Sequence, residues 1–190
     1  RRLEPRSPAP HARLRALAED ARLDPECLRA APRLLWSRLA VSSPLEAIEV
    51  RLIGSADLSL LESVDPDVFD NPVRHDLAAR FLDHPGNLLA VAIHAGTVVG
   101  MASAIAYVHP DKPLALFIAE VGVSARFHRR GIGKRLVQAL LERGRSMGCA
   151  EAWVATEEGN AAARSLYRSL EGAEDPERAV VYTWPLSPET

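Results

Sequence analysis

Apolar and polar positions follow regular patterns from Ile48 onward. The segment Ile48–Leu52 alternates apolar and charged residues, which indicates a half-buried strand. Ser55–Val64 carries apolar residues at helical spacing behind a serine cap, and Val73–Asp83 predicts a second helix that ends before His84-Pro85-Gly86. We therefore expect one strand followed by two helices in this part of the chain.

The next segments predict three consecutive strands. Leu88–Ile93 and Val98–Val108 are apolar runs separated by the compact turn sequence His94-Ala95-Gly96-Thr97, which is typical of an antiparallel hairpin. Leu114–Val123 is a further apolar run that follows the proline-containing segment 110–113. Three neighbouring strands of one sheet are the expected result.

Helices and strands alternate in the last part of the chain. Gly131–Met147 has apolar residues along one helical face and is followed by Gly148, a residue that often ends helices. Ala150–Thr156 predicts a strand, Asn160–Leu170 a helix and Ala179–Trp184 a last strand. The complete order is β-α-α-β-β-β-α-β-α-β, which predicts an α/β fold with a mixed sheet flanked by helices.

Residues 1–47 differ in composition from the rest. They are rich in Arg, Ala, Leu and Pro, and their leucines recur at rough helical spacing that prolines interrupt. We interpret them as an N-terminal extension, helical or partly disordered, and residues 48–190 as the main domain. An arginine-rich arm that binds RNA or DNA is the alternative, but the composition favours a solvated helical face.

Charge and composition restrict the class of protein. The net charge of −2 divides into +3 for residues 1–47 and −5 for residues 48–190, which disfavours nucleic acid and suits a cationic ligand. Neither a membrane span of roughly 20 apolar residues nor the apolar stretch of a secretory signal is found, so a cytoplasmic location is expected. Cys27 and Cys149 lack the spacing of metal ligands, and we predict no metal site.

The stretch Glu120–Leu136 is the most informative about chemistry. An apolar strand leads into a basic turn and then into a helix whose first turn contains Gly131 and Gly133. The unpaired N–H groups of a helix start bind anions, and glycine allows a ligand to approach closely, so a diphosphate fits this turn. A strand edge before it could bind an extended amide-bearing arm. Diphosphate and amide arm together describe coenzyme A.

Other phosphate-binding motifs do not match this stretch. Gly131-Ile132-Gly133-Lys134 lacks the spacing of a nucleoside-triphosphate loop, and Leu136 occupies the place of the third glycine in a dinucleotide fingerprint. A basic turn that only caps an amphipathic helix is the remaining alternative.

Two motifs resemble the Gcn5-related N-acetyltransferase family. The family signature is Gln or Arg, two residues, Gly, any residue, and Gly or Ala, and the matching segment is His128-Arg129-Arg130-Gly131-Ile132-Gly133. His128 departs from it, which weakens one side-chain contact. In the second motif, Asn160–Gly172, the resemblance places Asn160 and Tyr167 near the pantetheine arm and the sulfur. Without it, Asn160 would be a helix cap and Tyr167 a packing residue.

This resemblance implies a mostly antiparallel sheet that is splayed at an acetyl-CoA site, with residues 48–190 as an N-acetyltransferase domain. The strands 106–110 and 119–123 most resemble bacterial aminoglycoside 3-N-acetyltransferases. The residues predicted to bind acetyl-CoA are Val121, Gly122, Val123, His128, Arg129, Arg130, Gly131, Ile132, Gly133, Lys134, Asn160 and Tyr167.

Catalysis would require a base, a donor for the oxyanion and an acid. Glu120 is the candidate base that takes a proton from the amine through a water, and an anchoring role for a cationic substrate is the alternative. A main-chain N–H at Val121 or its neighbour could polarise the acetyl carbonyl, and the Tyr167 hydroxyl could protonate the sulfur.

The acceptor is expected to be a small cationic amine. Asp65, Asp67 and Asp70 lie in one loop and, with Glu120, are the candidate substrate-binding residues, helped by Glu157 and Glu158; a solvated turn is the alternative. An aminoglycoside or a polyamine would suit these carboxylates. A protein or peptide acceptor and a non-catalytic acyl-CoA sensor are the competing hypotheses, and a homodimer is a possible assembly.

Overall fold

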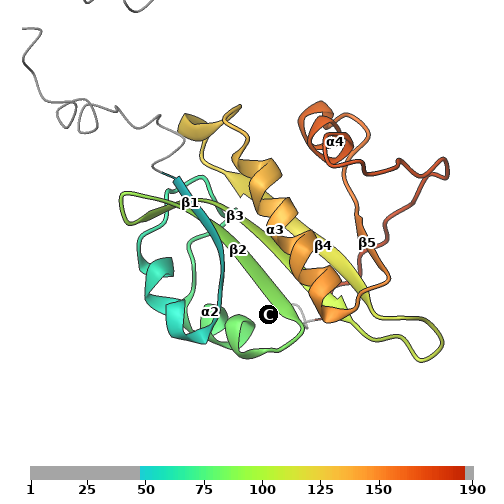
Figure 1. The fold of residues 1–190 in the computed structure, drawn as a ribbon, viewed down its shortest axis with the longest axis horizontal. Coiled ribbons are helices and arrows are strands. Elements are labelled where there is room, and N and C mark those ends of the chain that lie inside the picture. The colour runs from blue at the N-terminus through green and yellow to red at the C-terminus, as the bar shows by residue number, and fades with distance from the viewer. Residues whose placement is uncertain (1–47, 187–190) are drawn as a thin grey trace, which may run out of the picture. The chain divides into compact units, whose positions relative to one another are not determined.

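The computed structural model of the chain describes residues 48–186 (Figure 1). Its core is a five-stranded sheet in the order β1-β2-β3-β4-β5. The strands are β1 (Ile48–Ile53), β2 (Asn87–His94), β3 (Thr97–Tyr107), β4 (Ala115–Val123) and β5 (Glu151–Val154). The helices are the 3₁₀ helices η2 (Ser55–Glu62) and η3 (Ala125–Phe127) and the α-helices α2 (His75–Asp83), α3 (Ile132–Met147) and α4 (Ala161–Arg168).

The sheet is mostly antiparallel, as predicted. β1 to β4 pair antiparallel in sequence order, and only β4 and β5 pair parallel. The β2–β3 hairpin turns at Ala95 and Gly96, which have φ values of 49° and 80°. Two consecutive residues with positive φ are typical of the tight turn that matches the twist of an antiparallel pair, which explains the compact turn sequence.

The two faces of the sheet carry separate apolar clusters, because side chains alternate between faces along each strand. Alanines of β2 and β3 pack with Leu116 and Ile118 against the inner face of α3, whose buried residues include Leu136 and Leu140. The opposite face carries Val91, Met101 and their neighbours, and is covered by η2, α2 and the loop between them. We call these the α3 face and the α2 face.

β4 changes its pairing halfway along. The register with β3 shifts so that Ser103 lies opposite Glu120 while Ala104 lies opposite Ile118, which leaves Ala119 as a bulge. On its other side, β4 pairs with β5 only as far as Ile118 opposite Val154. The predicted splay of the sheet is therefore confirmed, and it begins at the bulge.

Two sequence predictions are wrong in detail. Ser55–Val64 forms the 3₁₀ helix η2, not an α-helix, and its cap is Gly54 with the Asp57 carboxylate; the Ser55 hydroxyl donates to Leu82. The last predicted strand, Ala179–Trp184, is irregular. Its residues have strand propensity, but among residues 48–186 no ladder bond joins them to another strand, and their side chains are exposed.

Residues 1–47, predicted as an N-terminal extension, lie outside the described residues, so the domain boundary stays a prediction. No helix within residues 48–186 has the length and apolar character that crossing a bilayer requires.

Candidate functional site

The turn between β4 and α3 exposes helix-start N–H groups. Gly131 is the N-cap of α3 and has a φ of 75°, a conformation that favours glycine, and Arg129 has a φ of 57°. The Arg135 N–H makes the first bond of the helix, 3.2 Å to the Gly131 carbonyl. The N–H groups of the three residues before it therefore have no acceptor within the helix, and the turn suits an anion.

Several basic side chains of this turn hold the turn itself. The His128 Nε2 donates to the Val123 carbonyl at 2.7 Å, which fastens the turn to the end of β4. The Lys134 Nζ donates to the Ser169 carbonyl at 2.8 Å, just after α4. The Arg130 guanidinium lies 5.1 Å from the Phe127 ring centre. Arg129 is exposed beside them. The positive charges of Arg129, Arg130 and Lys134 surround the turn even where their other contacts are structural.

Other predicted cofactor residues also have packing tasks. Ile132 is 1 % exposed and lies in the α3-face core, so only its main chain could reach a ligand. A Cβ on Gly133 would lie 3.4 Å from the Leu166 side chain, an ordinary contact distance, so Gly133 lies where α3 meets α4. A Cβ on Gly122 would lie 2.2 Å from the Val68 carbonyl oxygen. Gly122 thus lets the loop 65–70, which carries Asp65, Asp67 and Asp70 and which we call the acidic loop, cross the α2 face of β4.

Two carboxylates of the acidic loop fasten that loop to the turn between β4 and α3, the proposed cofactor turn. The Asp65 side chain is 8 % exposed, and both its oxygens accept bonds from Arg126 Nη2, at 2.6 and 2.8 Å. The Arg126 hydrogen bond holds the pKa of Asp65 below its usual range, against the opposing effect of burial. Asp67 accepts from the Ala125 N–H at 2.7 Å, which likewise lowers the Asp67 pKa. Because both carboxylates already bond to groups within the protein, we do not propose that Asp65 and Asp67 bind the acceptor amine.

Glu120 and Asp70 share a cavity. It has a volume of about 390 Å³ and lies on the α2 face between α2 and the strands β2, β3 and β4. Both carboxylates line it, with Ser103 beside Glu120 on the neighbouring strand. Partial burial, and then the negative charge of Asp70, raise the pKa of Glu120. A carboxylate with a raised pKa beside a cavity is a candidate base.

α4 carries the second motif and is capped at its N-terminus. The Asn160 side chain accepts from the Ala163 N–H at 3.0 Å, so it is the helix cap. Tyr167 is half-buried and packs against the α3-face core. Burial, and then the charge of Glu157, raise the pKa of Tyr167, so its phenol is neutral at physiological pH and able to donate a proton.

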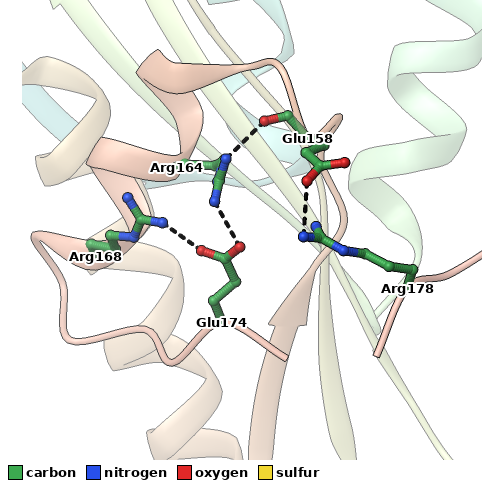
Figure 2. A network of polar contacts seen from close by, with 5 residues as sticks. All are labelled: Glu158, Arg164, Arg168, Glu174 and Arg178. Atoms are coloured by element: carbon green, nitrogen blue, oxygen red, sulfur yellow. Dashed lines mark hydrogen bonds and ion pairs between the residues drawn. The ribbon is translucent and has the colours of Figure 1, made fainter. Parts of the chain in front are cut away.

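An ion-pair network joins α4 to the segments around it (Figure 2). Glu174 accepts from Arg164 and Arg168 of α4, and the Arg164 guanidinium also donates to the Glu158 carbonyl. The Glu158 carboxylate pairs with Arg178 at 2.8 Å. Glu158, considered as an aid to substrate binding, therefore fastens the C-terminal segment to the loop before α4.

The predicted site residues thus fall into two groups. Glu120 and Asp70 meet at the α2-face cavity, whereas Val121, Val123 and Tyr167 pack against the α3-face cluster. The edge of β4 that β5 leaves unpaired lies between these groups. Sequence reasoning missed the cavity walls and the Asp65–Arg126 pair. Period-two spacing would have placed Met101 and Ser103 on one face, but no local signal joins residues 61 positions apart.

β4 has a free edge and leads into a helix start that suits an anion. This arrangement is typical of proteins that hold a diphosphate ligand with an extended arm, and the residues present fit coenzyme A. The family model for the acetyltransferase (GNAT) family matches residues 57–171. The chain belongs to this family and is an acetyl-CoA-dependent N-acetyltransferase.

Solved structures with the same fold include aminoglycoside acetyltransferases. The enzyme meta-AAC0020 from an uncultured soil metagenomic sample, in complex with sisomicin, is 19 % identical with a TM-score of 0.64, covering 74 % of this chain and 97 % of that one. AAC(6')-Iy, in complex with the bisubstrate analogue CoA-S-monomethyl-acetylneamine, is 21 % identical with a TM-score of 0.61, covering 73 % and 98 %.

Another neighbour has a different name. A ribosomal-protein-alanine N-acetyltransferase from Brucella melitensis biovar Abortus 2308 is 16 % identical with a TM-score of 0.58, covering 73 % of this chain and 100 % of that one. At these identities the likeness shows the fold alone. The 3-N type expected from the sequence is not matched by AAC(6')-Iy, which is of the 6' type.

Proposed function

We propose that this acetyltransferase transfers the acetyl group to the primary amine of a small molecule bound in the cavity beside Glu120. The observation that carries the proposal is the position of Glu120. It lies on the strand that leads into the cofactor turn, lines the cavity, and has a raised pKa. A base at that place is next to both ligands.

Acetyl-CoA supplies an acetyl group activated as a thioester. Glu120 takes a proton from the incoming ammonium through a water, which leaves the neutral amine that attacks. A main-chain N–H at Val121 or its neighbour donates to the oxygen that becomes negative. Because its raised pKa keeps Tyr167 protonated, its hydroxyl would supply a proton to the leaving thiolate, and the proton that the acylated nitrogen then loses would return to the phenolate through water.

The identity of the acceptor is the finer part of the proposal. Its amine is cationic before it reacts, which fits a cavity with two carboxylates, Glu120 and Asp70. Aminoglycosides and polyamines are the acceptors expected from the sequence, and two fold neighbours are aminoglycoside acetyltransferases. A peptide N-terminus is the alternative that the ribosomal-protein enzyme suggests.

The experiment is the pH dependence of acetyl transfer in the wild type and in Glu120→Gln. In the wild type, kcat should fall as the pH drops through the raised pKa of Glu120, because only the ionised carboxylate accepts a proton. The variant should lose this dependence and about 10²- to 10⁴-fold in kcat.

Two further measurements separate base from anchor. The dissociation constant for acetyl-CoA should stay unchanged in Glu120→Gln, and Glu142→Gln, at an exposed residue of α3, should behave as the wild type. If Glu120→Gln raises only the acceptor's KM and keeps the wild-type pH profile, Glu120 is an anchor and the proposed base is wrong.

A further inference from the structure

The walls of the cavity beside Glu120 are mainly apolar. Large apolar side chains from the loop, from α2 and from two strands surround it: Leu61, Phe69, Leu77, Phe81, Leu89 and Met101. Leu89 and Met101 belong to the buried core of the α2 face, so this part of the wall is fixed. A ligand in the cavity would therefore place most of its surface against hydrocarbon.

The charged groups that can meet a ligand are few and lie near one another. Asp70 and Glu120 both line this cavity, and the negative charge of Asp70 adds to the effect of burial in raising the pKa of Glu120. The other ionic side chain of the lining, Arg74, is paired with Asp76 at 2.8 Å. Asp65 and Asp67 are tied to the cofactor turn. Within its own lining the cavity thus offers one anionic end and no second carboxylate cluster for a distant ammonium group, because Glu62 lines only the adjoining cavity.

We infer, on the basis of the proposed function, that the acceptor is a monoamine with an apolar alkyl or aryl body. Its amine lies at Glu120 and Asp70, and its body lies between α2 and β3. A polyhydroxylated or polycationic amine would face apolar walls with groups that need hydrogen bonds, and each such group left without a partner costs free energy. This acceptor class differs from the polycation expected from the sequence.

The outer wall supports the same acceptor. Leu77 lines the cavity from α2 and is 47 % exposed, although the helix has polar residues available for solvent. An apolar body that packs against Leu77 would cover surface that otherwise faces water.

The test measures the acetylation of a series of amines by acetyl-CoA, and the reaction is monitored by the release of the CoA thiol. From butylamine to hexylamine, kcat/KM should rise about fourfold for each added methylene, the factor that corresponds to about 0.8 kcal/mol. Hexylamine should exceed 1,6-diaminohexane, which has the same length and a second ammonium group, by at least about tenfold. An aminoglycoside and a peptide complete the panel.

A pair of variants connects this preference to the cavity wall. Leu77→Gln should reduce the advantage of hexylamine over butylamine, while the fold tolerates the change because the side chain is half-exposed. Val108→Gln replaces an apolar residue that is 82 % exposed and does not line the cavity, so it should keep the wild-type ratio.

The outcomes separate this inference from the proposed function. Preference for diaminohexane, an aminoglycoside or the peptide, or a rate independent of chain length, overturns the monoamine inference while acetyl transfer stands. Failure to acetylate any amine, or transfer that does not depend on Glu120, overturns the proposed function and the inference with it.

Discussion

The two helices that cover the sheet differ in how firmly they are packed. α3 buries five residues, among them Leu136 and Leu140, against the strands. α2 has no buried residue, and cavities of about 390 and 400 Å³ are lined by its side chains. The proposed cofactor turn, between β4 and α3, therefore lies on the closely packed face of the sheet, and the proposed acceptor cavity lies under a loosely packed helix.

This difference fits the separate roles proposed for the two faces, cofactor binding on the α3 face and acceptor binding on the α2 face. The α3 face carries a turn whose N–H groups must keep a fixed position, which close packing favours. The α2 face carries open cavities beside α2, which leave room for the proposed acceptor. The Asp65–Arg126 pair and the Asp67 bond join the two faces across the end of β4.

The largest expected effect comes from truncating the rigid face. Leu140→Ala, at a residue with 0 % exposure, should lower the free energy of unfolding by about 2 to 5 kcal/mol. Leu77→Ala on α2 should change it by less than about 0.5 kcal/mol, since that side chain is half-exposed. Urea unfolding measures both. Equal losses would contradict the contrast between the two helices.

The next effect concerns the crossing of the acidic loop over β4. Gly122→Ala places a Cβ that would lie 2.2 Å from the Val68 carbonyl oxygen, so the loop must shift. We expect a loss of about 1 to 3 kcal/mol in unfolding free energy. Relative to the wild type, the KM for the amine should rise more than the KM for acetyl-CoA. Gly54→Ala is the control, because its added Cβ meets no atom within 4 Å. A shift in the acetyl-CoA KM alone would contradict this prediction.

A third experiment tests the cofactor turn. Gly131→Val should raise the dissociation constant for CoA at least about tenfold, or about 1.4 kcal/mol, because the strained backbone moves the N–H groups of the helix start. Gly96→Val, at a glycine with a similar φ of 80° in the β2–β3 turn, should cause comparable strain without that loss. Calorimetric titration with CoA distinguishes them. Equal affinity in both variants would remove the turn from the binding site.

The smallest effect should come from the link between the faces. Arg126→Gln should lower the free energy of unfolding only modestly near neutral pH, because the Arg126 side chain is 73 % exposed and water screens the ion pair. Since Arg126 lowers the folded-state pKa of Asp65, the contribution is complete above the ordinary aspartate pKa of about 4 and is lost as the pH falls through the lowered value. The stabilities of variant and wild type should therefore converge in acid. Arg74→Gln, which breaks an exposed pair with Asp76, should have a smaller effect at any pH.

The sequence by itself determined most of the helices and strands and the conformation of the turn proposed to bind the cofactor. Period-two alternation, helical spacing and glycine placement are local signals, so β1 to β4, α3 and the hairpin turn at Ala95 and Gly96 follow from neighbouring residues. The same holds for the motif around Gly131, whose conformation at the start of α3 depends on a single missing Cβ. The last strand was overpredicted, because strand propensity at 179–184 does not supply a pairing partner.

Only the tertiary structure decided which side chains are available to ligands. Three aspartates of one loop are alike in sequence, yet Asp65 and Asp67 bond to Arg126 and Ala125, while Asp70 lines the cavity with Glu120. Lys134 likewise lies at the cofactor turn but donates to a carbonyl after α4. A charged side chain takes the partners that chain folding brings to it, and these come from segments tens of residues away.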